Sequence, residues 1–292
     1  MDKNITNAKR AQVMIEALPY IKKYNGKIVV IKYGGNAMTN DDLKKQVMED
    51  MLLLWLVGVK VVLVHGGGPE INALMKKFDK KPEFVNGLRV TDKETVDIVE
   101  MALAGKVNKT LVSLLQRMGA KTLGLSGVDG LIVEAEFKNK ELGYVGNVVN
   151  INTAPIMTLL ENGYIPVIAT LGADRDGNVY NINGDTTASY IAGALKAAKM
   201  IMMTDIEGVL MDPKDPSTLI PEISVSEAEK LKKDGVISGG MIPKIDACLT
   251  ALERGVSAVS IMDGCKPHSI LMELLTDDGT GTMIVPDGTD DL

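Results

Sequence analysis

Four glycine-bearing segments of the chain each lie where an apolar run ends. Glycine permits positive φ and a close approach of backbone N–H groups to an anion, and a strand-to-helix turn leaves unpaired N–H donors at the helix start. Two of the segments also carry a lysine. Together they predict a phosphoryl-transfer site. The segments are Ile31-Lys32-Tyr33-Gly34-Gly35-Asn36-Ala37, His65-Gly66-Gly67-Gly68-Pro69, Asn181-Ile182-Asn183-Gly184-Asp185 and Gly239-Gly240-Met241-Ile242-Pro243-Lys244.

Two other interpretations of these glycines have to be weighed. A glycine turn after a strand is common in α/β proteins for steric reasons alone, so no single segment is diagnostic. The sequence from His65 to Gly68 is also similar to the oxyanion-hole segment of lipase-like hydrolases. The chain has no G-x-S-x-G nucleophile motif, however, and His268 has no evident serine partner. Neither the P-loop pattern nor the dinucleotide-binding G-x-G-x-x-G pattern occurs.

The composition is that of a globular protein with one large α/β unit or two domains. The 292 residues are 46% apolar, and a net charge of −6 without a basic block argues against a nucleic-acid partner. Two cysteines and two histidines are too few for a disulfide framework or a zinc site, and we name no protein ligand for a metal. The N-terminus lacks a secretory signal, and the longest apolar stretch, 51–59, is far below the roughly 18 to 20 residues that span a bilayer. We therefore expect a cytoplasmic protein without a membrane partner.

Strand and helix patterns alternate along most of the chain. Short apolar runs predict buried strands, and apolar residues at helical spacing predict the helices between them. We expect an α/β fold, an open three-layer αβα sandwich around a mainly parallel central sheet, with ligands at the carboxyl ends of the strands. The predicted strands are 27–33, 59–64, 131–137, 142–149, 164–170, 200–203, 257–262 and 282–285, and the predicted helices include 8–24, 41–57, 71–78, 107–118, 153–163, 184–196, 243–254 and 268–275.

Three local signals refine this pattern. Pro19 predicts a kink in the first helix, which lies outside the repeating α/β pattern. The two strand runs between residues 131 and 149 predict a hairpin over the site. Two helix-starting capping boxes are predicted, by Thr91 with Glu94 and by Ser224 with Glu227.

Five motifs make the chain similar to the amino-acid kinase family, and within it to the N-acetylglutamate kinases. The similarity spans residues 27–285. Four of the motifs are the glycine-bearing segments. The fifth is the most specific, because other kinases of the family share the lysines and glycines but act on different substrates. It is Asn86-Gly87-Leu88-Arg89-Val90-Thr91.

The resemblance implies phosphorylation of the γ-carboxylate of N-acetyl-L-glutamate by ATP with Mg²⁺, the second step of arginine biosynthesis. A carboxylate is already ionised at neutral pH, so this reaction requires no general base, and catalysis reduces to positioning and charge stabilisation. Carbamate, glutamate and aspartate kinases are the enzymatic alternatives. A degenerate member that senses a ligand is the non-enzymatic one, and the retained lysines count against it.

The same resemblance implies roles for the charged and glycine residues. Lys32 and Lys244 approach the transferring phosphoryl group from two sides, and Asp185 lies between them and holds both ammonium groups. Backbone N–H groups are implied to bind phosphoryl oxygens or to border the acyl substrate. They belong to Gly34, Gly35, Gly67 and Gly68.

Two further side chains are implied to bind the acyl substrate. Arg89 suits a bidentate contact with its α-carboxylate, and Asn181 can donate and accept hydrogen bonds at the N-acetylated amino group. Arg89 could instead form a surface ion pair with Asp92 or Glu94, and Asn181 could be an ordinary turn residue.

ATP is implied to lie between two segments of the C-terminal third. Mg²⁺ is held mainly through the nucleotide phosphates and water in this family. The residues implied to contact the nucleotide are Thr204, Asp205, Gly208, Gly239, Gly240 and Met241.

The first helix resembles the N-terminal extension of arginine-inhibited acetylglutamate kinases, which interlace such helices to join dimers into hexameric rings. The resemblance implies a homo-hexamer, a trimer of dimers, that L-arginine inhibits, with Tyr20, His268 and Glu273 near the effector. The helix could instead pack on its own subunit. We divide the chain into an oligomerisation extension at 1–26, an acyl-binding lobe at 27–197 and a nucleotide-binding lobe at 198–292.

Overall fold

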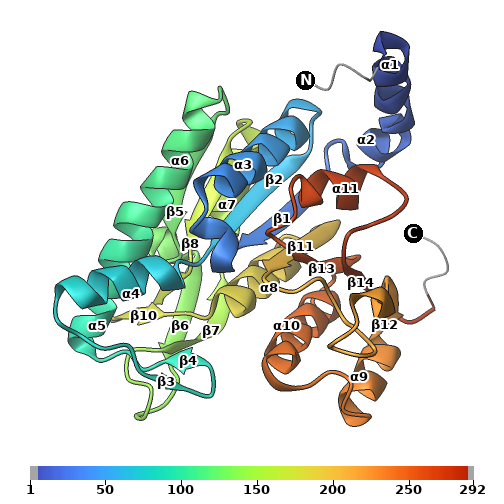
Figure 1. The fold of residues 1–292 in the computed structure, drawn as a ribbon. Helices are drawn as coiled ribbons and strands as arrows, with labels where there is room; N and C mark the ends of the chain where they lie inside the picture. Colours follow the sequence, from blue (N-terminus) through green and yellow to red (C-terminus); the bar gives the residue numbers. More distant parts are fainter. Residues whose placement is uncertain (1–5, 289–292) are drawn as a thin grey trace.

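A computed structural model describes residues 6–288, and an eight-stranded sheet forms its centre (Figure 1). The strands are β1 (Ile28–Tyr33), β2 (Lys60–His65), β5 (Thr122–Ser126), β8 (Ile165–Ala169), β11 (Lys199–Thr204), β12 (Glu222–Ser224), β13 (Val259–Asp263) and β14 (Thr282–Val285). Their order is β12-β14-β13-β11-β1-β2-β8-β5. All neighbours are parallel except β13 and β14. The predicted, mainly parallel sheet is confirmed.

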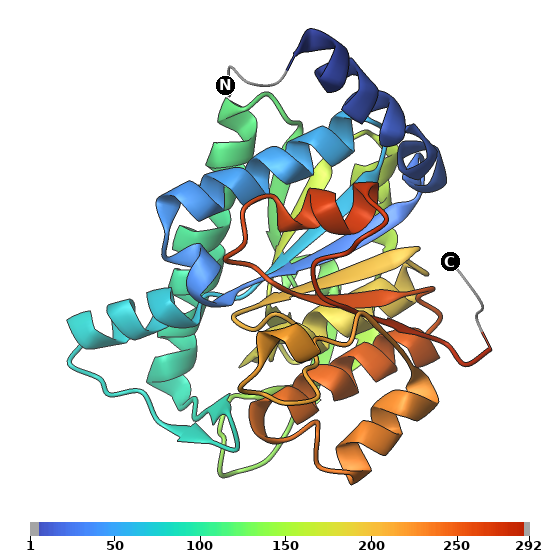
Figure 2. The same ribbon diagram turned by 45° about the vertical axis from the view of Figure 1, so that its right-hand side comes forward.

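Helices cover both faces of this sheet (Figures 1 and 2). One face packs against α3 (Asp41–Leu56), α6 (Asn108–Arg117) and α11 (Ser269–Leu275), and the other against α7 (Ala154–Glu161), α8 (Gly184–Ala194) and α10 (Ile242–Glu253), with α9 (Val225–Lys233) beside α10. Side chains alternate between the faces of a strand, so Val29 and Ile31 join the first core and Val30 joins the second. The predicted three-layer αβα arrangement is confirmed.

A smaller four-stranded sheet lies beside the central one. It has the order β10-β9-β6-β7 and comprises β6 (Val133–Phe137), β7 (Gly146–Ile151), β9 (Leu171–Ala173) and β10 (Val179–Asn181). β6 and β7 are antiparallel, which confirms the predicted hairpin. The second strand begins later than predicted, because Gly143, with φ +69°, and Val145 form isolated bridges to Thr91 and Asn181 and do not continue the pairing with β6.

The predicted first helix is two helices that project from one end of the molecule (Figure 1). α1 (Asn7–Glu16) and α2 (Leu18–Tyr24) meet at Ala17. Pro19 lies in the first turn of α2, where its missing N–H would have had no partner, so the predicted kink is confirmed. α1 buries none of its residues against the rest of the chain, and Met14 is 72% exposed.

The segment after β2 lies at the opposite end from α1 and holds α4 (Gly68–Lys77), β3 (Phe84–Val85), β4 (Leu88–Arg89) and α5 (Lys93–Glu100). The capping box predicted for Thr91 is wrong. Asp92 caps α5, because its carboxylate accepts from the Thr95 N–H at 2.7 Å, while the Thr91 hydroxyl donates to the Arg89 carbonyl. The predicted box of Ser224 and Glu227 is confirmed.

A π-helical segment, Met101–Val107, joins α5 to α6. Such segments insert an extra residue into a helix and often occur at functional sites. The predicted helix at 107–118 is therefore only the last part of a longer helical run. Among residues 6–288, no helix is long and apolar enough to cross a membrane.

Candidate active site

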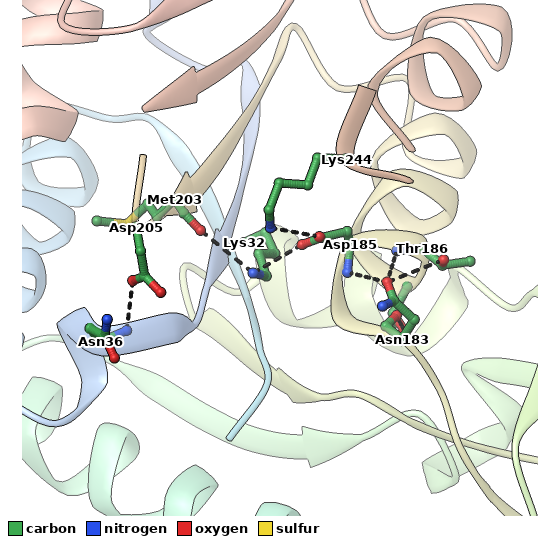
Figure 3. A network of polar contacts seen from close by, with 9 residues as sticks. Lys32, Asn36, Asn183, Asp185, Thr186, Met203, Asp205 and Lys244 are labelled. Atoms are coloured by element: carbon green, nitrogen blue, oxygen red, sulfur yellow. Dashed lines mark hydrogen bonds and ion pairs between the residues drawn. The ribbon is translucent and has the colours of Figure 1, made fainter. Parts of the chain in front are cut away.

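Three charged side chains from three elements meet beyond the carboxyl end of β1 (Figure 3). Lys32 lies near the end of β1, Asp185 in the first turn of α8 and Lys244 in the first turn of α10. Asp185 Oδ1 lies 2.9 Å from Lys32 Nζ, and its Oδ2 lies 3.3 Å from Lys244 Nζ. The side chain of Lys32 is 10% exposed and that of Lys244 is 24% exposed. The two lysines of the predicted site thus share one carboxylate.

The cluster carries an excess of positive charge. Burial by itself would raise the pKa of Asp185, but the ammonium groups of Lys32 and Lys244 hold that pKa below its ordinary value. The carboxylate is therefore ionised at neutral pH and cancels one of the two cationic charges. The remaining charge lies in a setting with little water, where it attracts an anion strongly.

Asn183 fixes the position of Asp185. Its side-chain oxygen accepts from the N–H groups of Asp185 and Thr186, both at 3.0 Å, and so caps α8 (Figure 3). An acidic residue in the first helical turn is also favoured by the helix dipole. Asn183 was not among the predicted site residues, although an asparagine directly before a helical run is a known N-cap signal.

The glycine turn after β1 is held by Asp205, which follows β11. The Asn36 N–H donates to Asp205 Oδ1 at 2.7 Å (Figure 3). Gly35 has φ +74°, and a Cβ atom there would lie 2.5 Å from the same oxygen. Only glycine fits this position without displacing the carboxylate. Gly34, between this turn and Lys32, is extended. Asp205, a predicted nucleotide residue, therefore shapes the loop that follows Lys32.

Gly67 and Gly68 lie at the start of α4. Gly67 is the N-cap residue and Gly68 is the first helical residue. Within residues 6–288, the N–H groups of these two glycines have no protein acceptor. They are therefore available to an anion at the N-terminus of a ten-residue helix.

A cavity of about 480 Å³ opens beside Lys244. Ile206, Val209 and Ile237 give it an apolar side, and its volume suits a nucleotide base and sugar. Gly239 begins the neighbouring turn Gly239–Met241 but does not line the cavity. The other predicted nucleotide residues, Thr204, Asp205, Gly208, Gly240 and Met241, all line it.

Arg89 is a buried cation without a carboxylate partner among the described residues. Its Nη2 donates to Asn72 Oδ1 at 2.6 Å, its Nη1 lies 3.2 Å from Met75 Sδ, and its guanidinium carbon lies 4.8 Å from the centre of the Phe84 ring. The residue is 7% exposed, and burial lowers its pKa. Asn72 was not among the predicted site residues.

The alternative surface ion pair for Arg89 is wrong. Asp92 and Glu94, its candidate partners, both bind Lys80 instead, at 2.6 and 2.8 Å. Those carboxylates belong to the exposed side of α5, whereas the guanidinium lies inside, against α4. A guanidinium held in this way can accept an anionic ligand.

Asn181 is half-buried at the end of β10 and is linked to Arg89 through Thr91. Its Nδ2 donates to Thr91 Oγ1 at 3.3 Å, and the Thr91 hydroxyl donates to the Arg89 carbonyl at 2.8 Å. The Asn181 N–H also bonds to the Tyr144 carbonyl. The segments 86–91 and 181–185 of the predicted acyl site are therefore joined by the side-chain hydrogen bond between Asn181 and Thr91.

A second cavity, of about 530 Å³, lies between α2 and the strand β11. Tyr20 and Glu273, two of the predicted effector residues, line it. Glu273 is 2.7 Å from Lys199 and also accepts from Ser260. Lys199 was missed in the sequence, although a lysine that opens a buried strand is a visible signal.

His268, the third predicted effector residue, does not line this cavity. Its Nδ1 lies 2.6 Å from Oδ1 of Asp50, a buried residue of α3. The pair therefore ties α11 to α3. Within the part of the chain that the structure describes, the His268 ring bonds to the Asp50 carboxylate and has no hydrogen bond to a serine, which the hydrolase alternative would require.

His65 is completely buried, and burial lowers its pKa to about 4, with the charge of Lys109 acting in the same direction. Between that value and the ordinary 6.5, the unfolded chain binds a proton that the folded chain does not. The free energy of unfolding should therefore fall by about 2 kcal/mol from pH 7 to pH 5 on account of this residue. Denaturant titrations of the parent and His65→Asn at both pH values test this. An equal loss of stability in the two proteins would contradict it.

Within residues 6–288, no three or more His, Cys, Asp or Glu side chains gather as they would around a metal ion. The carboxylates nearest the cluster already have partners. Asp185 faces two ammonium groups, and Asp205 accepts from the Asn36 N–H.

Comparisons with known proteins agree on one family. The model of the amino acid kinase family matches residues 27–263. An acetylglutamate kinase of Clostridioides difficile (strain 630) is 52% identical, over 95% of this chain and 98% of that relative. Among solved structures, an N-acetylglutamate synthase from Neisseria gonorrhoeae, complexed with coenzyme A and L-arginine, is 26% identical with a TM-score of 0.79. The match covers 95% of this chain and 65% of that one, so this chain spans slightly less than two thirds of the synthase.

A carbamate kinase from Giardia lamblia bound to AMP-PNP shares the fold, with a TM-score of 0.64 at 19% identity over 90% of this chain and 99% of that one. The predicted resemblance to acetylglutamate kinases and the predicted enzyme class are confirmed. The chain belongs to the amino acid kinase family.

Proposed function

We propose that this enzyme transfers the γ-phosphoryl group of ATP to the γ-carboxylate of N-acetyl-L-glutamate and so forms N-acetyl-L-glutamyl 5-phosphate, in the second step of arginine biosynthesis. The observation that carries the proposal is the largely buried Lys32–Asp185–Lys244 cluster, in which the partly exposed Lys244 also lines the nucleotide-sized cavity. The 52% identity to an acetylglutamate kinase supports the choice of acceptor.

In the proposed step, a γ-carboxylate oxygen attacks the γ-phosphorus while the bond to the β,γ-bridging oxygen breaks and ADP leaves. The nucleophile is ionised at neutral pH, so no residue has to remove a proton. Lys32 and Lys244 stabilise the charge on the phosphoryl oxygens, and Asp185 keeps both ammonium groups in place before the substrates bind. The N–H groups of Gly34, Gly35, Gly67 and Gly68 are proposed as further donors to the phosphoryl and acyl oxygens.

Arg89 and Asn181 are proposed to bind the acceptor. The buried guanidinium has five N–H donors, and within residues 6–288 its hydrogen-bond partners are Asn72 and the thioether of Met75. The α-carboxylate of the acceptor would complete this set with a charge-assisted contact. Asn181 is proposed to bind the acetamido group.

Mg²⁺ is proposed to bind with the nucleotide and to offset phosphate charge. The nearby carboxylates are engaged with protein donors, which suits a metal held by phosphate oxygens and water. The protein is also proposed to be cytoplasmic and to consist of an acyl-binding lobe at 27–197 and a nucleotide-binding lobe at 198–292.

ADP release by the purified protein tests the function, with N-acetyl-L-glutamate, glutamate, aspartate and carbamate as separate acceptors. We expect turnover with N-acetyl-L-glutamate alone. Turnover with another acceptor would contradict the roles of Arg89 and Asn181, and no turnover with any of the four would favour a ligand sensor.

Feedback inhibition by L-arginine is proposed at the cavity between α2 and β11. Glu273, whose side chain is 5% exposed and already pairs with Lys199, offers a carboxylate to a guanidinium, and Tyr20 comes from the N-terminal helices. The exposed apolar residues of α1 suit contact with a second subunit in a hexamer, built as a trimer of dimers. The arginine complex of the gonococcal synthase supports this choice of effector.

The arginine proposal predicts that millimolar L-arginine lowers turnover of the parent, whereas Glu273→Gln keeps its turnover and loses most of the inhibition. Arginine titrations of ADP release measure both. Glu229→Gln, on the surface of α9, should remain as sensitive as the parent. An uninhibited parent would remove the regulatory proposal and leave the catalytic one intact.

A further inference from the structure

The loop that joins β2 to α4 contains a buried histidine that the proposed reaction does not use. His65 ends β2 and is fully buried. Its Nδ1 lies 2.9 Å from the carbonyl oxygen of Gly66, and its Nε2 lies 3.0 Å from the side-chain nitrogen of Asn108. Asn108 is the first residue of α6 and is also fully buried. The ring is therefore bound at both nitrogens.

Other neighbours fix the orientation of the Asn108 amide. Its Nδ2 lies 3.0 Å from the Leu125 carbonyl and 2.9 Å from the Val167 carbonyl, which only accept. Its Oδ1 lies 3.0 Å from Lys109 Nζ, which only donates. Turning the amide over would set its oxygen against two carbonyls and its NH₂ against an ammonium group. The two N–H groups of the Asn108 amide are therefore shared among the Leu125 carbonyl, the Val167 carbonyl and His65 Nε2, and the amide nitrogen cannot accept a hydrogen bond from the ring.

The amide orientation in turn fixes the histidine tautomer. Because Asn108 donates, Nε2 of His65 accepts, and the single ring proton of the neutral form is on Nδ1. Nδ1–H then donates to the Gly66 carbonyl. The buried ring, with Lys109 nearby, stays neutral at pH 7, so no second proton competes with this assignment.

The bond to the Gly66 carbonyl sets the direction of the next N–H group. The Gly66 C=O and the Gly67 N–H belong to one planar peptide unit and point in opposite directions. The Gly66 N–H is held by the Tyr33 carbonyl at 3.1 Å. On the other side, a Cβ atom on Gly67 would lie 2.7 Å from Leu103 Cδ2 of the π-helical segment. Three consecutive glycines have little preference for one peptide orientation, and these contacts select one.

We propose that His65, kept in the Nδ1-protonated tautomer by Asn108, is a positioning residue that directs the Gly67 N–H at the phosphoryl or acceptor oxygens. The inference rests on the proposed function, which assigns that N–H to the reacting groups. His65 touches no substrate and moves no proton in this role. It prevents the Gly66–Gly67 peptide from turning its carbonyl toward the anion.

Two substitutions test the contributions of the two ring nitrogens one at a time. His65→Asn places an amide NH₂ near the Nδ1 position and can still donate to the Gly66 carbonyl, whereas His65→Gln reaches the Nε2 position and leaves that carbonyl without its donor. We expect His65→Gln to lower kcat by about 10- to 100-fold with the KM for ATP nearly unchanged, and His65→Asn to stay within about threefold of the parent. Thr122→Val is the matched control, because it removes another buried hydrogen bond, between β5 and β8, away from this loop.

Nitrogen NMR of the histidine-labelled parent tests the tautomer without any variant. The chain has only two histidines, and a His268→Asn sample assigns the signals. We expect the Nδ1-protonated neutral form of His65 at pH 7. The Nε2-protonated form, an unchanged kcat in folded His65→Gln, or equal losses in His65→Gln and His65→Asn would each overturn the proposal. If neither variant folds, the tautomer of His65 observed by NMR in the parent decides between the proposal and its rejection. A parent without turnover would contradict the proposed function, while the tautomer would still test the loop geometry.

Discussion

Replacing Lys244 by alanine is expected to lower kcat by about 100- to 1000-fold while binding of ATP and of the acceptor remains measurable. Lys244 Nζ lies 3.3 Å from the buried Asp185 carboxylate, and the residue lines the nucleotide cavity. Charge moves between the bridging oxygen and the phosphoryl oxygens during transfer. A preorganised ammonium group in a setting with little water therefore contributes more to the transition state than to the bound substrates.

The protein should tolerate this substitution. The pair of Lys32 and Asp185, at 2.9 Å, remains in Lys244→Ala, so the buried carboxylate keeps a cationic partner. Lys230→Ala, on the exposed side of α9, is the matched control and should retain parental turnover. Steady-state ADP release gives kcat, calorimetric titration gives the affinity for ATP, and thermal unfolding tests the fold. A folded Lys244→Ala protein with unchanged turnover would refute the assigned role.

The sequence predicts the central sheet well, because its inner strands are buried on both faces and read as nearly continuous apolar runs. β1, with the sequence Ile28-Val29-Val30-Ile31, is an example. β5 was not predicted, because it is an edge strand in which Leu123 is 43% exposed and Gly124 interrupts the apolar run. The three-residue strand β12 gives no periodic signal. The π-helical segment is not predicted from the sequence either, because the spacing of its apolar residues also fits an ordinary α-helix.

The charged cluster is predictable because its members lie at the ends of elements in short motifs. In a parallel sheet, loops after neighbouring strands meet at one edge, so Asn36, after β1, and Asp205, after β11, come together although 169 residues separate them. Residues that act through other side chains are not predictable in this way. Asn72 and Asn108 are recognised only from the hydrogen bonds that they make to Arg89 and His65 across separate elements. The placement of His268 beside Asp50, outside the effector cavity, likewise depends on how α11 packs on α3.

Replacing Arg89 by alanine is expected to raise the KM for N-acetyl-L-glutamate by about 100-fold or more, because a charge-assisted contact to a buried guanidinium contributes about 3 kcal/mol. The KM for ATP should change by less than about threefold. Arg89→Lys should recover little of the low KM that the parent has for N-acetyl-L-glutamate. An ammonium group cannot lie flat against Phe84 and also present two parallel donors beside Asn72. Steady-state ADP release with each substrate varied in turn measures both constants.

An acceptor analogue makes this prediction specific to one group of the substrate. N-acetylglutamate with its α-carboxylate converted to a carboxamide lacks the charge that Arg89 is proposed to bind. The parent should discriminate strongly against the analogue, whereas Arg89→Ala should treat the analogue and the natural acceptor nearly alike. Arg175→Ala is the matched control, because Arg175 is exposed and pairs with Glu134 at the surface, where an ion pair contributes little.

The comparison separates the two ways in which Arg89 could matter. A purely structural Arg89 would, when replaced, weaken the use of both acceptors and of ATP together, because loosening of α4 against β3–β4 would also disturb the glycine loop at the start of α4. A substrate-binding Arg89 changes only the acceptor constants and removes the preference for the carboxylate. If Arg89→Ala retains the full preference for N-acetyl-L-glutamate over the carboxamide, the α-carboxylate is bound elsewhere. The buried guanidinium would then have to be explained by its packing against Phe84 and Met75 alone.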